Sequence, residues 1–93
     1  MSYELEFLPS ALKEWKRLDS NTREQFRKKL EERCENPRMP AAQLFGAKDR
    51  YKIKLKSAGY RLVYEVRDER LVVLVIAVGK RERSAVYEAA KKR

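Results

Sequence analysis

Four cationic side chains are spaced along one predicted β-hairpin in a way that suits a phosphate group. Lys52, Lys54 and Lys56 alternate with apolar residues, and Arg61 follows a turn that contains Gly59. Residues two apart in a strand point to the same face of a sheet, so the three lysines share a face. In a tight hairpin Arg61 joins them. We interpret this cationic face as a candidate phosphate-binding site.

Two further arginines follow the last predicted strand. Arg81 and Arg83 leave the end of that strand, and we expect Arg81 to converge with the hairpin cations. A second interpretation stays open, because lysines on an exposed strand protect a sheet edge from pairing with other chains. That protective role explains Lys56 at least as well as phosphate binding does.

The residue inventory excludes most hydrolytic chemistry. The chain has no histidine and only three glycines, which excludes Ser-His or Cys-His machinery, a histidine metal site and a Gly-rich phosphate loop. The acidic residues of the second half do not cluster as the ligands of two metal ions would. An enzyme of this composition that acts on nucleic acid would need no cofactor and would depend on lysine, arginine and tyrosine.

Positive charge is concentrated in the second half of the chain. Residues 1–49 hold 10 Lys/Arg against 9 Asp/Glu, which is typical of solvated helix surface, whereas residues 50–93 hold 13 against 5. A one-sided positive field attracts polyanions, chiefly nucleic acid or an acidic protein segment. The alternative is a basic protein without such a partner.

Length and composition indicate one globular domain over residues 1–93, of which 43% are hydrophobic. No apolar run is long enough to span a membrane, and the first residues lack the features of a signal peptide. Cys34 is the single cysteine and has no internal disulfide partner. We therefore expect a reducing, cytoplasmic location.

The first half of the chain predicts a strand and two helices. Apolar and acidic residues alternate over 3–7, as in a half-buried strand, and Pro9 suits the start of a helix that continues to Leu18. A second helix is expected from Asn21 or Thr22, where two capping-box sequences overlap, to residue 36. Its apolar stripe includes Cys34, which makes this thiol a core residue rather than a nucleophile. Residues 37–48 are interpreted as a loop.

The second half predicts three strands, over 51–55, 60–67 and 71–78, and a short helix with Ser84 as its N-cap. The third of these strands is apolar at every position, so both of its faces are covered and it is central in the sheet. The order is β-α-α-β-β-β-α. This predicts an α+β fold with a mainly antiparallel sheet and two helices packed on one face.

Several stretches of the chain resemble the RelE toxin family. The resemblance is carried by YKIKLKSAGYRLVYEV (51–66) and VVLVIAVGKRERSAVY (72–87), and it extends to ALKEWKRL (11–18) and REQFRKKL (23–30). Members of this family are ribosome-dependent endoribonucleases that cut messenger RNA in the decoding A site. They are held inactive by an antitoxin, RelB.

The resemblance implies a RelE-like fold and an active site made of Lys52, Lys54, Arg61, Arg81 and Tyr87. It also implies a RelB-like antitoxin as partner, the ribosome with its messenger RNA and ribosomal RNA, and binding of operator DNA through the antitoxin. The basic residues outside the site, Arg50, Lys56 and Arg83, are candidate contacts to ribosomal RNA. One departure is Phe45, where the family carries an arginine, and it puts one RNA contact in doubt but not the chemistry.

Metal-free cleavage of RNA agrees with these residue types. The 2′-hydroxyl must lose a proton, the charged transition state must be stabilised, and the leaving 5′-oxygen must be protonated. Crowding among cations favours the neutral form of a lysine, so Lys52, Lys54 and Tyr87 all remain candidates for the base. Arg61 suits a phosphate clamp, and the family places Arg81 at the leaving group. The ring of Tyr87 could also stack on a base or simply belong to the core.

Two rival classes stay open. ParE-type proteins resemble the same fold but act on DNA gyrase, and they would not need this set of lysines, arginines and a tyrosine. A non-catalytic module that binds RNA or an antitoxin would keep the charge without Tyr87 beside Arg81.

Overall fold

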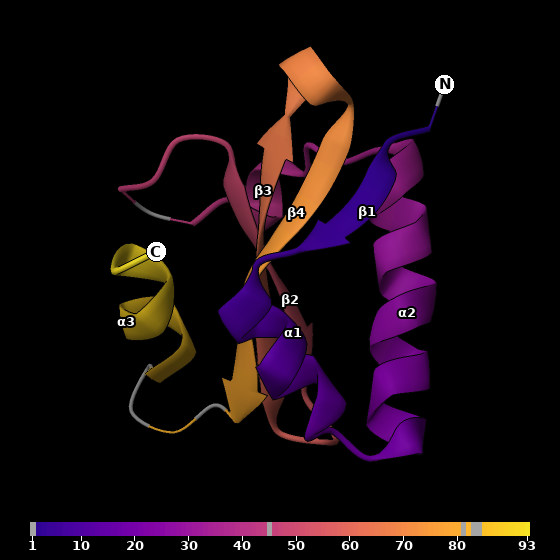
Figure 1. Cartoon of the computed structure of the whole chain (residues 1–93), viewed down its shortest axis with the longest axis vertical. Coiled ribbons are helices and arrows are strands. Elements are labelled where there is room, and N and C mark those ends of the chain that lie inside the picture. Colours follow the sequence, from indigo (N-terminus) through magenta and orange to yellow (C-terminus); the bar gives the residue numbers. More distant parts are fainter. Residues whose placement is uncertain (1, 45, 81, 83–84) are drawn as a thin grey trace.

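The structure is a computed structural model that describes residues 2–44, 46–80, 82 and 85–93. Its helices and strands follow the predicted order and are shown in Figure 1. In chain order they are β1 (Glu4–Phe7), α1 (Pro9–Lys16), α2 (Ser20–Glu35), β2 (Arg50–Leu55), β3 (Tyr60–Arg67), β4 (Val72–Lys80) and α3 (Ala85–Lys91), with short 3-10 helices η1 (Pro40–Ala42) and η2 (Asp68–Arg70).

The four strands form one sheet in the order β1-β4-β3-β2. The pairs β2–β3 and β3–β4 are antiparallel, and β1 pairs with β4 in parallel. β4 is buried from Val72 to Val78 because strands flank it on both sides and helices cover both of its faces. The predicted α+β fold and the central position of this strand are confirmed.

Helices cover both faces of the sheet (Figure 1). α1 and α2 pack on one face, where Phe26 and Leu30 of α2 meet Ile53 and Tyr64 in the larger apolar cluster. α3 packs on the other face, where its residue Val86 belongs to the second cluster. The two N-terminal helices therefore share a face, as predicted, and the C-terminal helix forms a third layer.

Several predicted boundaries differ from the structure, and α1, for example, ends at Lys16 rather than at Leu18. α2 begins at Ser20, earlier than predicted, because Asp19 adopts the extended backbone of an N-cap and aspartate is a favoured residue there. β4 begins at Val72 because Leu71 has a φ of 52°, outside the β region. The predicted cap Ser84 lies outside the described residues.

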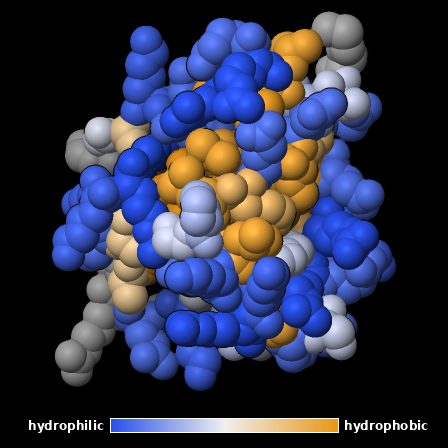
Figure 2. Space-filling model, in the orientation of Figure 1, coloured by the Kyte–Doolittle hydropathy of each residue, from blue (hydrophilic) through white to orange (hydrophobic). Residues whose placement is uncertain are grey.

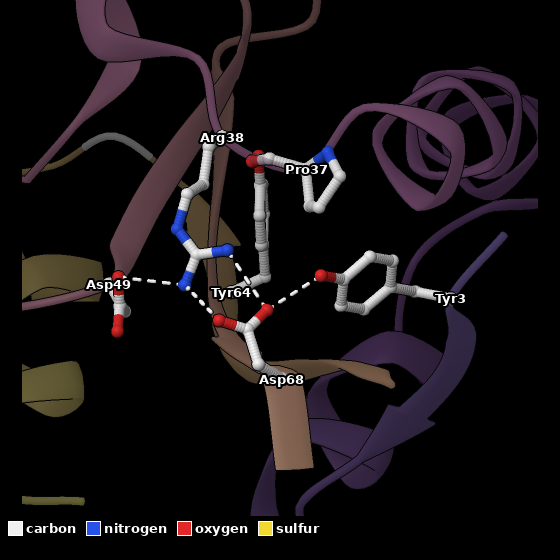
Figure 3. Close-up of polar contacts among 6 residues, drawn as sticks. All are labelled: Tyr3, Pro37, Arg38, Asp49, Tyr64 and Asp68. Atoms are coloured by element: carbon white, nitrogen blue, oxygen red, sulfur yellow. Dashed lines mark hydrogen bonds and ion pairs between the residues drawn. The ribbon is translucent and has the colours of Figure 1, made fainter. Parts of the chain in front are cut away.

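A polar cluster fixes the segment between α2 and β2 (Figure 3). Arg38 donates to both carboxylate oxygens of Asp68, at 3.0 and 2.9 Å, and to Asp49 at 3.1 Å. The hydroxyl of Tyr3 donates to the same Asp68 at 2.6 Å. These bonds, first from Arg38 and then from Tyr3, hold the pKa of Asp68 below its ordinary value. The cluster joins the residue before β1, the segment before β2 and the turn after β3.

The face with α1 and β1 in front carries apolar surface at its centre, ringed by hydrophilic side chains (Figure 2). Large apolar side chains that are exposed include Leu5 of β1 and Leu12 of α1. None of the helices within the described ranges is both long and apolar enough to cross a bilayer.

Candidate active site

The β2–β3 hairpin brings the predicted cations onto one face of the sheet. Lys54 lies directly opposite Arg61 in the antiparallel register, and Lys52 lies opposite Val63. The apolar residues of β2 face α2, so Lys52 and Lys54 point to the other face. Lys54 is exposed, whereas Lys52 and Arg61 are half-buried. Directly opposed side chains of a sheet stand about 5 Å apart at their Cβ atoms, so Lys54 and Arg61 can contact one phosphate.

Tyr87 reaches the same place from α3. Arg61 Nη1 donates a hydrogen bond of 3.1 Å to the Tyr87 hydroxyl, and the guanidinium carbon lies 5.8 Å from the centre of the tyrosine ring. Tyr87 also packs against the second apolar cluster. The ring is therefore partly a packing group, as one interpretation of the sequence held, while its hydroxyl faces the cations.

The approach of α3 to the sheet depends on a small residue in β4. Gly79 lies opposite Arg61 in the β3–β4 register, and a Cβ atom at Gly79 would lie 3.4 Å from a methyl carbon of Val86. Val86 is buried in the second cluster one position before Tyr87. This close packing sets α3 over the strand that neighbours Arg61.

Residues 81, 83 and 45 carry three of the sequence predictions, and all three lie outside the described residues. They are the leaving-group candidate Arg81, the RNA-contact candidate Arg83 and the departure from the family pattern, Phe45. β4 ends at Lys80, which pairs with Tyr60.

The other two candidate RNA contacts lie in different environments. Lys56 is exposed in the turn after β2. Arg50 begins β2, and its side chain is only 17% exposed. Its Nε donates to Glu65 at 2.9 Å and its Nη1 donates to the carbonyl oxygen of Ala90 at 2.6 Å. The charge of Arg50 is thus offset within the protein, which the sequence pattern did not indicate.

A residue that the sequence analysis missed supports the strand of the lysines. Arg33 of α2 donates to the Tyr64 hydroxyl at 2.8 Å and to the carbonyl oxygen of Lys52 at 3.4 Å. Tyr64 is fully buried, and its hydroxyl donates to Pro37 at 2.7 Å. Burial raises the pKa of Tyr64. The charge pattern of the first half predicts solvated surface, and no sequence signal distinguishes Arg33 from its exposed neighbours.

Among the described residues, carboxylates compensate several arginines but not Lys52, Lys54 or Arg61. In the described part of the chain, Glu or Asp side chains form ion pairs with Arg38, Arg50, Arg67, Arg70 and Arg93. Over the same described residues, Lys52, Lys54 and Arg61 take part in no ion pair. Uncompensated cations on one open face attract an anion, and the types present suit a phosphodiester.

Comparison with known proteins shows that this chain is similar to toxins of toxin-antitoxin systems. A family model described as the ParE toxin of type II toxin-antitoxin system, parDE, matches residues 5–85. The mRNA interferase toxin RelE of Escherichia coli K12 is 60% identical over 93 residues, which cover 100% of this chain and 98% of that protein.

Two solved structures extend the comparison to the fold. A mutant of E. coli toxin RelE in the free state matches with a TM-score of 0.92 at 58% identity, over 100% of this chain and 98% of that chain. The intact E. coli RelBE toxin-antitoxin complex matches with a TM-score of 0.84 at 58% identity, over 88% of this chain and 100% of that chain. The similarity includes the hairpin, β4 and the segment that carries Tyr87.

Proposed function

This chain belongs to the RelE toxin family, and the model of the ParE toxin of type II systems also matches most of it; on this premise we propose that it is an mRNA interferase. The proposed reaction is cleavage of messenger RNA in the ribosomal A site, which stops translation. The observation that carries the proposal is the pairing of Lys54 with Arg61, joined by Tyr87, on one face without carboxylate partners in the described residues.

The proposed mechanism uses the 2′-hydroxyl that precedes the scissile phosphate as the nucleophile. Arg61 clamps the phosphate with its planar guanidinium, where negative charge develops in the transition state. Lys52, Lys54 and Tyr87 remain the candidates for the base that removes the proton of the 2′-hydroxyl. We assign the leaving oxygen to Arg81, as the resemblance to the RelE toxins implies. No step of this scheme requires a metal ion.

The ribosome supplies what these residues lack. Lysine and arginine are poorly matched to proton transfer near neutral pH, so cleavage of free RNA should be slow. Holding the messenger with its 2′-hydroxyl in line with the phosphorus would lower the barrier, because orientation alone can contribute many orders of magnitude. Binding to the ribosome in the cytoplasm therefore forms part of the proposal, with Lys56 and Arg83 as candidate contacts to ribosomal RNA.

The ParE-like alternative has less support than the RelE assignment. The ParE model matches residues 5–85, whereas the 60% identity to RelE extends over the whole chain. One experiment separates the classes: the purified protein is incubated with ribosomes programmed with a defined message, and the new 5′ ends are mapped. A cut within the A-site codon is expected. Inhibition of gyrase with an intact message would instead favour the ParE-like class, and binding with neither effect would favour a non-catalytic module.

We also propose a RelB-like antitoxin as the partner, and that the complex binds operator DNA through that antitoxin. An E. coli relative has been solved in such a toxin-antitoxin complex. The excess of cations in residues 50–93 predicts acidic residues in the antitoxin. Exposed apolar side chains such as Leu5 and Leu12 predict that the antitoxin also carries apolar residues. Expression with the neighbouring gene should yield a stable complex and restore growth, and failure to do either would contradict the partner.

A further inference from the structure

α3 is short, and its position on the sheet depends on contacts with the rest of the protein. It spans seven residues, Ala85–Lys91, whereas helices shorter than about 12 residues are marginal in water on their own. Its buried side chains, Val86 and Ala90, are small, and Tyr87 and Ala89 of the same helix are only partly buried against the second cluster. Polar contacts at its C-terminal end must therefore contribute to fixing the helix that carries Tyr87.

Two arginines supply such contacts. Arg93, just after α3, donates to both carboxylate oxygens of Glu14, at 2.9 and 3.1 Å, and to the carbonyl oxygen of Ile76 at 2.9 Å. Arg50 donates to the carbonyl oxygen of Ala90 at 2.6 Å, within the helix itself. The last carbonyl groups of a helix lack partners inside it and carry partial negative charge, so a guanidinium is favoured there.

We propose that Arg50 is a positioning residue that holds the C-terminal end of α3 on the sheet and thereby keeps Tyr87 on Arg61. Arg50 lies two positions before Lys52 on the same face of β2, and Ala90 lies one helical turn after Tyr87. One guanidinium thus joins the strand that carries the lysines to the helix that carries the tyrosine. The effect on cleavage rests on the proposed function, whereas the effect on α3 does not.

A second hydrogen bond of Arg50, to Glu65, fixes the orientation of the guanidinium that contacts Ala90. Its Nε donates to Glu65 at 2.9 Å, and the other oxygen of Glu65 accepts from Arg67 at 2.6 Å. Burial alone would raise the pKa of Glu65, but the hydrogen bonds from Arg50 and Arg67 outweigh it and hold that pKa below its ordinary value. The carboxylate of Glu65 is therefore charged, and its oxygen Oε1, which Arg67 does not contact, holds the guanidinium of Arg50.

This assignment separates Arg50 from a direct RNA contact. Its Nε and Nη1 are engaged within the protein, and Glu65 offsets its charge. Lysine at position 50 would keep the charge but could not bridge Glu65 and Ala90, because an ammonium is a point donor without the planar fork. Replacement by lysine therefore distinguishes the two roles.

The test compares Arg50→Ala and Arg50→Lys with Arg67→Ala. Arg67 pairs with the same carboxylate and, among the contacts of the described residues, makes none with α3. Amide hydrogen exchange and the NMR signals of the Tyr87 ring are recorded first, on the free protein. In both Arg50 variants the amides of α3 should exchange at least tenfold faster and the NMR signals of the Tyr87 ring should shift. Amide exchange in β3 and β4 should stay unchanged. Arg67→Ala should leave amide exchange in α3 and the Tyr87 signals unchanged.

Cleavage on programmed ribosomes is then measured under single-turnover conditions at saturating ribosome. Both Arg50 variants should cut about 10- to 100-fold more slowly, and Arg67→Ala at the normal rate. In a Tyr87→Ala background the further loss caused by Arg50→Ala should shrink to less than twofold, because residues that act through one another are not additive.

Several outcomes would overturn the proposal. Unchanged exchange in α3, normal cleavage by both Arg50 variants, or full additivity with Tyr87→Ala would each show that Arg50 does not act through the helix. If Arg50→Lys cut at the normal rate while Arg50→Ala did not, Arg50 would act as a direct RNA contact through its positive charge. If the wild-type protein does not cut RNA at all, the proposed function fails, and the exchange and NMR data still decide whether Arg50 holds α3 and Tyr87.

Discussion

Arg61 and Tyr87 lie 26 residues apart in the sequence, and the guanidinium of Arg61 donates a hydrogen bond of 3.1 Å to the Tyr87 hydroxyl. The tyrosine ring lies 5.8 Å from the guanidinium carbon, within reach of a cation–π interaction. This contact joins the hairpin of cations to α3. It places a phenol and a stacking ring next to a residue suited to hold the phosphate.

Removal of the Tyr87 hydroxyl tests whether this contact serves chemistry or packing. Tyr87→Phe keeps the ring, and proton transfer by a positioned side chain contributes about 100-fold or more. We expect cleavage by Tyr87→Phe to fall by that factor, measured in single turnover on programmed ribosomes. Tyr3→Phe is the matched control, because it also removes one hydroxyl bonded to a charged group, Asp68, at a distance from the site. Equal rates for the two variants would show that the Tyr87 hydroxyl takes no part in proton transfer and would leave the ring with packing or stacking.

The lysines of β2 give a second prediction. Lys52→Ala and Lys54→Ala should each reduce cleavage at least 100-fold, because each removes a phosphate ligand or a base. Both side chains lie on the face away from the larger apolar cluster, so the unfolding midpoint should change little. The measurements are single-turnover cleavage and thermal unfolding.

Lys28→Ala, at an exposed position of α2, is the control for loss of one positive charge. It should leave both quantities unchanged. If the double variant of Lys52 and Lys54 still cut at close to the normal rate, the active site would have to lie elsewhere.

Strand periodicity predicted much of this site. Alternation over residues 51–55 placed Lys52 and Lys54 on one face, and the structure has them there because Ile53 and Leu55 are buried against the helices. The antiparallel pairing of Lys54 with Arg61 followed from the short turn between the strands. These features are local, and local patterns are visible in sequence.

The contacts of α3 could not be predicted in the same way. The sequence indicated a short helix, but its place on the face opposite α1 and α2 depends on packing with β4. The pairing of Arg50 with Glu65 and Ala90 depends on the register of β2 and on that helix together. The charge pattern predicted that Arg50 is free to contact RNA, because a sequence does not show which cations are paired with carboxylates.

The acidic side of the stability profile gives a third prediction. Arg38, and then Tyr3, hold the pKa of Asp68 below its ordinary value, and the pKa of Glu65 is also lowered. A carboxylate whose pKa is lower in the folded state stabilises the fold above its unfolded pKa and loses that contribution as the pH falls through the folded one. The free energy of unfolding should therefore decrease below about pH 4, where carboxylates of the unfolded chain bind protons.

Urea unfolding from neutral pH down to about pH 3 measures this decrease. In Glu65→Gln the free energy of unfolding should decrease less steeply below about pH 4, because one of the responsible carboxylates is gone. Glu69→Gln, at an exposed position in the turn with Asp68, is the control. If the free energy of unfolding of Glu65→Gln decreased as steeply as that of the wild type, other carboxylates would cause the loss of stability at low pH.

The products of cleavage give the last prediction. The chain has no histidine to activate water, and the neighbouring 2′-hydroxyl is the nucleophile available to a lysine or tyrosine base. The upstream fragment should therefore end in a 2′,3′-cyclic phosphate and the downstream fragment in a 5′-hydroxyl. Mass spectrometry of the fragments identifies the first, and direct labelling of the downstream end by a kinase identifies the second.

A single 2′-deoxy substitution just before the scissile phosphate provides the control. This message keeps every phosphate, so it should still occupy the ribosome and bind the protein, but it should resist cutting because the nucleophile is missing. A deoxy substitution one nucleotide further upstream should leave cleavage unchanged. Fragments with upstream 3′-hydroxyl ends, or normal cutting of the first substituted message, would refute attack by the 2′-hydroxyl even if Lys52, Lys54 and Arg61 prove essential.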